Sequence, residues 1–290
     1  MANDGPSHEP VMVAEVIGYL GGRERVADMT VGAGGHAEAL LEAGVGRVIG
    51  FDRDPDALRL AGDRLARYGD RFTASHRRFS QVGEAEATGP LHGVLFDLGV
   101  SSMQLDEPER GFGYRVAGPL DMRMGGSDVT AADLVNDLPE RELADLLFEY
   151  GQEHRSRRIA AAIARARQRT RIETTDQLAG VVVGAVGRRP GGPHPARRTF
   201  QALRIAVNRE LEELAASLPR AVGLLGPGGR VVVLSYHSLE DGIVKRAFRD
   251  DERLSVLTKK PLRPSPEEAA RNPRARSAKL RAAERVEEAA

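Results

Sequence analysis

The alternation of strand-like and helix-like segments between residues 25 and 102 constrains the fold of this chain more than any other feature. The apolar run 25–32, RVADMTVG, enters a glycine-rich turn, and residues 36–44, HAEALLEAG, follow with helical spacing. A second run at 47–54, RVIGFDRD, precedes a helical segment at 55–69. Strands that alternate with helices form parallel sheets with helices on both faces. The sequence therefore predicts an α/β fold with a doubly wound, mostly parallel sheet.

A helical segment interrupts this pattern. The buried strand at 93–102, GVLFDLGVSS, is followed by residues 105–127, which are rich in glycine, proline and charge and show no periodicity. A long helix at 200–225 and a strand at 230–238 later resume the α/β pattern. The helix-like stretches in between are 130–151, 154–168 and 174–186.

These changes of pattern predict two domains. We expect a core domain formed by residues 1–105 and 199–290, and an inserted helical domain formed by residues 106–198. Two further candidate strands in the tail, 253–261 and 278–286, belong to the core.

The composition excludes several classes of protein. The chain has no cysteine, which excludes disulfides, thiolate zinc sites and cysteine nucleophiles, and the histidines lack metal-ligand spacing, so no metal is expected. No apolar run approaches the length of a transmembrane helix, and the first ten residues lack the features of a signal peptide. We therefore expect a cytoplasmic protein that does not bind membranes.

Charge is distributed unevenly along a chain whose formal net charge is zero. Residues 154–171 and 271–281 carry positive charge and no acidic side chain. Such runs are either solvated surfaces or contacts for nucleic-acid phosphates, because phosphate binding needs local positive potential rather than a high overall charge.

The glycine turn and the strand after it indicate a nucleoside-containing cofactor. Gly32, Gly34 and Ala37 satisfy the pattern G-x-G-x-x-[GA] between a strand and a helix, which by itself is a weak signal. Asp52 ends the next strand, where a carboxylate can accept both hydroxyls of an adenosine ribose. The two features together do not separate NAD from S-adenosylmethionine.

Further candidates lie near the carboxyl ends of the strands, where ligands bind in open α/β sheets. Asp97 ends the strand at 93–102 and is either a pocket carboxylate or a turn residue, and His36 is either a pocket residue or an ordinary helix residue. Phe79 could be an apolar wall for adenine or a core side chain, and His237 follows the strand at 230–238. Ser235 and His237 lack a nucleophile elbow, so a hydrolase triad is disfavoured.

Several long segments resemble the bacterial ribosomal RNA small subunit methyltransferase H family. The matching stretches include DMTVGAGGHAEALL (28–41), GFDRDPDAL (50–58) and FDLGVSSMQLDEPERGFGYRVAGPLDMRM (96–124), and later GPGGRVVVLSYHSLEDGIVK (226–245) and NPRARSAKLRAAER (272–285). The resemblance implies a class I Rossmann-like methyltransferase core, a helical insert that recognises substrate, and transfer of a methyl group from S-adenosyl-L-methionine to N4 of a cytosine in the decoding region of 16S rRNA. Tyr236 departs from the family, in which phenylalanine is commoner.

The resemblance also implies site residues and partners. The positions that match the family's cofactor-binding residues are Gly34, Gly35, His36, Asp52, Phe79, Asp97 and Gln104. Asp97 is our candidate acceptor for the amine hydrogens of the cytosine, and His237 is a second candidate on the substrate side. The expected partner is 16S rRNA within the small ribosomal subunit, and the sequence leaves the oligomeric state open, a homodimer included.

Two other functions compete with this interpretation. The glycine pattern alone would suit an NAD-dependent oxidoreductase, although no acid or base for hydride chemistry can be assembled from the motifs. A ribosome-assembly factor that uses the same fold only to hold RNA is the second alternative, and the intact glycine turn, Asp52 and Asp97 argue against it.

Overall fold

The computed structural model describes residues 10–83, 89–100, 107–125 and 128–286, and within them the chain forms two compact units. The first unit comprises Met1–Gly99 and Leu211–Ala290, and the second comprises Val100–Glu210. The sequence placed these boundaries at 105 and 199. Helix α10 (Arg197–Asn208) belongs to the second unit because its buried residues Phe200 and Leu203 are part of that unit's core.

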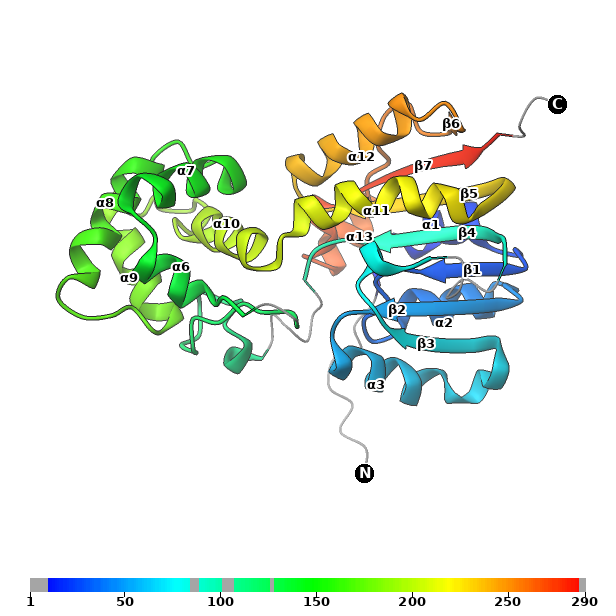
Figure 1. Cartoon of the computed structure of the whole chain (residues 1–290), viewed down its shortest axis with the longest axis horizontal. Helices are drawn as coiled ribbons and strands as arrows, with labels where there is room; N and C mark the ends of the chain where they lie inside the picture. Colours follow the sequence, from blue (N-terminus) through cyan, green and yellow to red (C-terminus); the bar gives the residue numbers. More distant parts are fainter. Residues whose placement is uncertain (1–9, 84–88, 101–106, 126–127, 287–290) are drawn as a thin grey trace. The chain divides into compact units, whose positions relative to one another are not determined.

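The first unit contains a seven-stranded sheet with the order β3-β2-β1-β4-β5-β7-β6 (Figure 1). Strands β1 to β5 are parallel, whereas β7 pairs antiparallel with both β5 and β6. The predicted mostly parallel α/β sheet is therefore confirmed. The strands are β1 (Arg25–Asp28), β2 (Arg47–Asp52), β3 (Phe72–His76), β4 (Leu91–Asp97), β5 (Leu225–Ser235), β6 (Leu254–Val256) and β7 (Lys279–Arg285).

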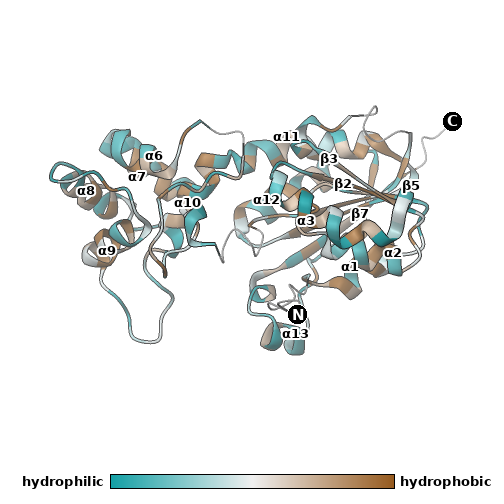
Figure 2. Ribbon diagram, turned by 90° about the horizontal axis from the view of Figure 1, so that it is seen from below, coloured by the Kyte–Doolittle hydropathy of each residue, from teal (hydrophilic) through white to brown (hydrophobic). Residues whose placement is uncertain are grey.

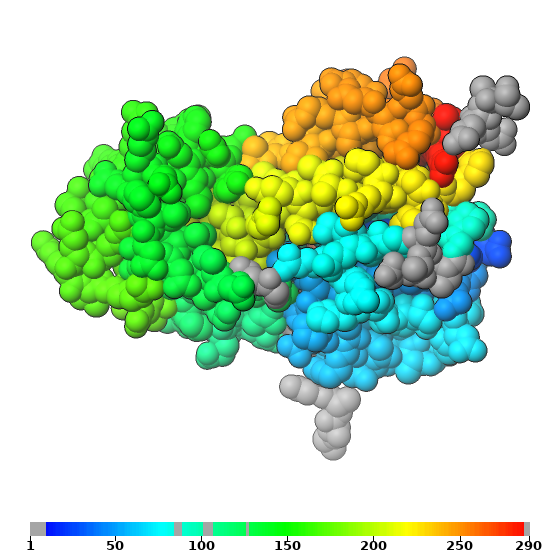
Figure 3. All heavy atoms as spheres, viewed as in Figure 1, coloured from blue at the N-terminus to red at the C-terminus, as the bar shows by residue number. Residues whose placement is uncertain are grey.

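Helices cover both faces of this sheet, and the strands alternate their side chains between the two cores. On β4, Val94 and Phe96 join the core that α11 and α12 cover, while Leu95 joins the core that α1, α2 and α3 cover. Figure 2 shows the apolar strands, and Figure 3 shows the outer surfaces of α11 in yellow and α12 in orange. The helices of this unit are α1 (Val13–Leu20), α2 (Gly35–Glu42), α3 (Pro55–Leu65), α12 (Ser238–Asp250) and α13 (Pro266–Arg271), with α11 (Glu210–Leu224) at the boundary.

The strand order reverses at β1, which lies between β2 and β4. In open α/β sheets the ligand crevice forms outside the carboxyl ends of the strands at such a reversal. The carboxyl ends of β1, β2 and β4 are Asp28, Asp52 and Asp97, and the fold therefore brings these three carboxylates to one place.

The second unit is a bundle of helices around its own apolar core. Pro139 ends the helix that the sequence predicted at 130–151 and divides it into α6 and α7, and Arg209, with φ of 49°, separates α10 from α11 in the predicted helix 200–225. The core combines these helices with Phe112, Leu120 and Met122. The helices are α6 (Ala131–Asp137), α7 (Glu140–Gly151), α8 (Ser156–Arg167), α9 (Thr175–Val186) and α10.

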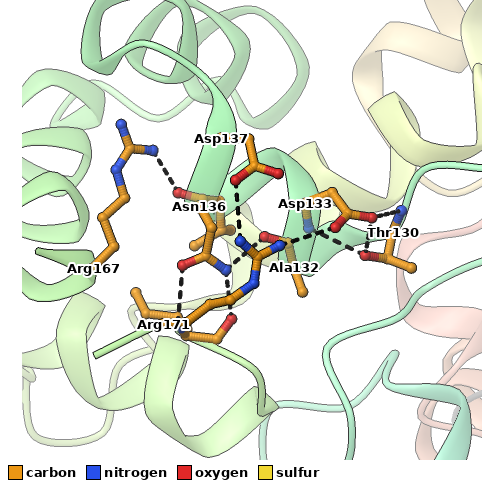
Figure 4. Close-up of polar contacts among 9 residues, drawn as sticks. Thr130, Ala132, Asp133, Asn136, Asp137, Arg167 and Arg171 are labelled. Carbon is orange, nitrogen blue, oxygen red and sulfur yellow. Dashed lines mark hydrogen bonds and ion pairs between the residues drawn. The ribbon is translucent and has the colours of Figure 1, made fainter. Parts of the chain in front are cut away.

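A polar cluster fixes α6 against the segment that follows α8 (Figure 4). Asn136 donates to the carbonyls of Ala132 and Ile172, and its Oδ1 accepts from the Ile172 amide at 3.0 Å. Arg171 forms ion pairs with Asp133 and Asp137 at 3.1 Å. Among the described residues, no helix of either unit combines the length and the apolar character needed to cross a membrane.

Candidate active site

The glycine turn between β1 and α2 holds a backbone conformation that requires glycine. Gly32 and Gly34 have φ of 53° and 82°, in the region where a Cβ is unfavourable. A Cβ built on Gly34 would lie 3.0 Å from Leu65 Cδ1 and 3.3 Å from Ala61 Cα, so α3 closes against the turn. Glycine at this position therefore lets α3 pack closely against the turn at the carboxyl edge of the sheet.

Asp52 links the end of β2 to this turn. Its Oδ2 accepts from the Gly32 amide at 2.9 Å, and its Oδ1 accepts from the Asp54 amide at 2.9 Å. Burial raises the pKa of Asp52, and hydrogen bonds from these two amides and from the Arg53 amide oppose that rise. A carboxylate offers about four acceptor positions, so Asp52 keeps capacity for a further donor, as a ribose hydroxyl would be.

Asp97 lies at the centre of the site. Its Oδ1 accepts from the Tyr236 hydroxyl at 2.7 Å, its Oδ2 lies 3.4 Å from His36 Nδ1, and its own amide donates to Thr30 Oγ1 at 2.7 Å. Burial raises the pKa of Asp97, while the charge of His36 and the hydrogen bond from Tyr236 act in the opposite direction. The side chain is 26% exposed, so a ligand can reach it.

His36 is a buried member of the site. It is the second residue of α2, its side chain is 5% exposed, and Nε2 lies 2.8 Å from the carbonyl oxygen of Val11. A carbonyl can only accept, so Nε2 carries the proton and donates. The other ring nitrogen, Nδ1, faces Asp97. The sequence left the role of His36 open between pocket and helix, and the geometry places the ring beside Asp97, so a cofactor contact stays a prediction.

Asp28 and Thr30 also belong to the site, although the sequence analysis did not select them. Asp28 is 1% exposed and accepts from the Thr30 amide at 3.1 Å. Burial raises the pKa of Asp28 to about 7, against the charge of His36 and the Thr30 amide, and with a further rise from Asp97 and Asp52. Asp28 ends β1 as Asp52 ends β2, and this repeated position is the signal that could have identified it.

Phe79 and Gln104 are the remaining predicted cofactor residues. Phe79 begins a short 3-10 helix (Phe79–Gln81) and is partly buried against Phe96, with ring centroids 5.7 Å apart in an edge-on arrangement. It thus combines core packing with an exposed edge. Gln104 lies outside the residues that the structure describes.

His237 has a structural position at the start of α12. It is the N-cap residue of this helix, and its Nδ1 accepts from the Glu240 amide at 3.4 Å while Nε2 lies 3.0 Å from Glu240 Oε1. Glu240 in turn accepts from the amides of Tyr236 and His237. Nδ1 is therefore engaged within the helix turn, whereas Nε2 lies close to Glu240 without forming a hydrogen bond. Its proposed role on the substrate side stays a prediction.

The two basic runs are only partly available for phosphate contact. In the run 154–171, Arg155 and Arg167 donate to backbone carbonyls and Arg171 pairs with two aspartates (Figure 4). In the tail, Lys279 and Arg281 both contact Asp241, at 3.0 and 2.7 Å, and Arg281 is buried. Of the two alternatives for the tail run, phosphate contact therefore does not suit these two residues, since β7 uses them to anchor α12.

The turn and the carboxylates fit the chemistry of S-adenosylmethionine. Asp52 retains an acceptor position for a ribose hydroxyl, and the positive φ of Gly34 keeps this position of the turn free of a side chain. Asp97 offers a carboxylate that a cationic sulfonium can reach, whereas Asp28 is buried, and the charge of His36 favours the ionised form of both.

Comparison with known proteins gives the family. The model of the MraW methylase family matches residues 6–286. The ribosomal RNA small subunit methyltransferase H of Sorangium cellulosum is 50% identical over 289 residues, which cover 97% of this chain and 92% of that protein. The proteins of the same name from Azorhizobium caulinodans and Thermomicrobium roseum are 48% and 47% identical, over 99% and 97% of this chain and 89% and 94% of their own lengths. With this match over nearly its whole length and the site described above, the chain belongs to the MraW methylase family and is an S-adenosylmethionine-dependent methyltransferase.

Proposed function

We propose that this protein methylates the exocyclic N4 of a cytosine in the decoding region of 16S rRNA, within the small ribosomal subunit. Sequence identity supports rRNA as the substrate. About half of the residues, over almost the full chain, are identical to those of proteins named ribosomal RNA small subunit methyltransferase H. The position of Asp97 at the reversal of strand order supports chemistry on an amine.

Asp97 is the residue that we propose to act on the amine. S-Adenosylmethionine supplies an activated methyl group when bound. The amine of cytosine is a poor nucleophile because its lone pair is delocalised, and a carboxylate that accepts an N–H hydrogen bond favours the more nucleophilic, tetrahedral nitrogen. Methylation releases one proton from this nitrogen. Because burial raises the pKa of Asp97, its carboxylate is a stronger base than an exposed one and can take that proton.

Exposed arginines on α8 and just after it are our candidates for the RNA phosphates. Arg157, Arg158, Arg165 and Arg169 are exposed, and no acidic side chain pairs with them among the residues that the structure describes. The opposite face of α8 buries Ile159 and Ile163 in the core of the second unit. The arginine face of α8 therefore presents positive charge on a helix that is held in place by its buried face, which suits binding to a phosphate backbone.

Methyl incorporation into small ribosomal subunits tests the proposed function. Subunits that lack the modification are incubated with the protein and labelled S-adenosylmethionine, and the RNA is digested for nucleoside analysis. We expect label in N4-methylcytidine. Label in another nucleoside, or none in any RNA although the protein binds S-adenosylhomocysteine, would contradict the proposal. Sedimentation of the purified protein tests the homodimer that the sequence leaves open.

Substitution of Asp97 separates its two roles. Asp97→Ala should abolish turnover even at saturating S-adenosylmethionine, because the amine loses its acceptor. Titration with S-adenosylhomocysteine reports the cofactor contact separately. If the variant binds weakly but methylates at the normal rate once saturated, Asp97 contacts the cofactor and does not act on the amine.

A further inference from the structure

The segment before α1 lies against the start of α2 and contacts two residues of the proposed cofactor site. A Cβ built on Gly35 would lie 3.2 to 3.4 Å from three ring carbons of Pro10, so the backbone of Gly35 and Pro10 are closely packed. The carbonyl of the next residue, Val11, accepts from His36 Nε2 at 2.8 Å. The orientation of the His36 ring therefore depends on where this segment places one carbonyl.

Met12 fixes the position of that carbonyl through an unusual backbone conformation. Met12 has φ of 54° and ψ of 40°, a left-handed conformation that non-glycine residues rarely adopt, and its side chain is completely buried. Its amide donates to Glu268 Oε1 at 2.7 Å, across 256 residues of sequence. Backbone strain of this kind persists only where surrounding contacts hold it, and it is concentrated at functional sites.

The contacts form a continuous path from Glu268 to the centre of the site. Glu268 holds the amide of Met12, the Val11–Met12 backbone places a carbonyl, and that carbonyl fixes the proton of His36 on Nε2. The remaining nitrogen, Nδ1, then faces Asp97 Oδ2 at 3.4 Å. A neutral His36 would present a lone pair to an ionised carboxylate, which is repulsive, so a proton shared between Nδ1 and Oδ2 stabilises this contact.

We propose that Glu268, on α13, is a positioning residue for the methyltransferase site, which orients His36 against Asp97 through the backbone of Val11 and Met12. The inference rests on the proposed role of Asp97. Glu268 does not touch the reacting groups. It is partly buried, and its backbone amide donates to Oγ of Ser265, the N-cap residue of α13, at 3.1 Å.

The charge state of Asp97 is the property that this path controls. The groups that act on Asp97 are His36 from α2, Tyr236 after β5 and Glu240 from α12. Asp28 from β1 is a fourth group, because its carboxylate and that of Asp97 repel each other. His36 and Tyr236 lower the pKa of Asp97, and Glu240 raises it. If the His36 ring loses its anchor, Asp97 loses a stabilising charge and its pKa rises.

Two substitutions at Glu268 test the proposal. Glu268→Ala removes the acceptor for the Met12 amide. We expect the dissociation constant for S-adenosylhomocysteine to rise on the order of tenfold, because the backbone that packs on Gly35 and orients His36 loses its anchor. The acidic limb of the kcat profile should move to higher pH. Glu268→Gln keeps an oxygen that can accept from the same amide, and we expect it to restore both properties. Glu252→Gln, at an exposed position just before β6, is the matched control and should behave as the wild type.

Nitrogen NMR of the histidine rings gives a readout that needs no turnover. In the wild type and in Glu268→Gln, His36 should show a protonated Nε2, and in Glu268→Ala the signal should indicate mixed tautomers. An unchanged His36 signal and pH profile in a folded Glu268→Ala protein would overturn the proposal, as would a folded Glu268→Gln protein that behaves like Glu268→Ala. The binding and NMR measurements use no RNA, so their outcome is independent of whether 16S rRNA is the substrate.

Discussion

Asp28 shows how burial at the end of a strand sets the charge state of one residue. Its carboxyl is 1% exposed, and its pKa is raised to about 7 mainly by burial. In an unfolded chain an aspartate titrates near pH ~3.9. Between these two values the folded protein holds a proton that the unfolded chain has released. The folded state therefore becomes less stable as the pH rises through this window.

Asp28→Asn removes this titration with little change in shape. Unfolding by urea, followed by circular dichroism from pH 4 to pH 8, should show that the wild type loses stability relative to the variant as the pH rises. The relative loss should reach at most about 4 kcal/mol, and it should level off above pH ~7. Parallel curves for the two proteins over this range would show that Asp28 titrates normally in the fold.

At the scale of elements, Asn208 joins the last turn of α10 to the loop that contains Met122 and Met124. Its Oδ1 accepts from the Met124 amide at 3.0 Å, and its Nδ2 donates to the Met122 carbonyl at 2.7 Å. Asn208 is 2% exposed, and Met122 is buried with φ of 64°. The Asn208 side chain thus supplies hydrogen-bond partners for the backbone of a loop that has no regular secondary structure.

Asn208→Ala should destabilise the second unit by roughly 2–4 kcal/mol, because it leaves two buried backbone groups without partners. Hydrogen exchange of the amides in α6 to α10 measures the loss. The exposed Gln168, just after α8, provides the control, since Gln168→Ala removes no buried contact. Equal protection in the two variants would mean that water or another group replaces Asn208.

Helices and strands could be predicted where a local run of residues has the periodicity and the end signals of a single type of element. The buried strands β1, β2, β4 and β5 follow from continuous apolar runs, and Asp52 and Asp97 follow from the polar ends of those runs. The long predicted helices were wrong at Pro139 and Arg209, where one backbone conformation ends each helix. The contact of Met12 with Glu268 joins residues 256 apart, and no local pattern contains it.

At the scale of the whole molecule, the zero net charge hides an uneven distribution of charge. Some arginines form hydrogen bonds or ion pairs within a unit, as Arg167 does with a carbonyl and Arg281 with a carboxylate. Others, such as Arg158 and Arg165, lie exposed seven residues apart, on one face of α8. Position in the fold, rather than the count of basic residues, therefore decides which of them can meet RNA.

The combined substitution Arg158→Gln and Arg165→Gln should weaken RNA binding and reduce its dependence on salt. Each phosphate contact contributes roughly 0.7 to the slope of log K against log salt concentration for single strands. Filter binding to a 16S rRNA fragment between about 50 and 200 mM salt measures both the affinity and its salt dependence. Arg249→Gln, which affects an exposed pair with Asp250, is the control. An unchanged slope would remove α8 from the RNA-binding surface.

The place of β7 in the sheet has a consequence for biosynthesis. Strand β7 is made after every other strand, yet it pairs with β5 along Arg230 to Ser235 and separates β5 from β6. Until β7 has been synthesised, this edge of β5 has no strand to pair with, and Asp241 has neither of its cationic partners. A chain truncated before β7 would thus present an unpaired strand edge, which favours aggregation.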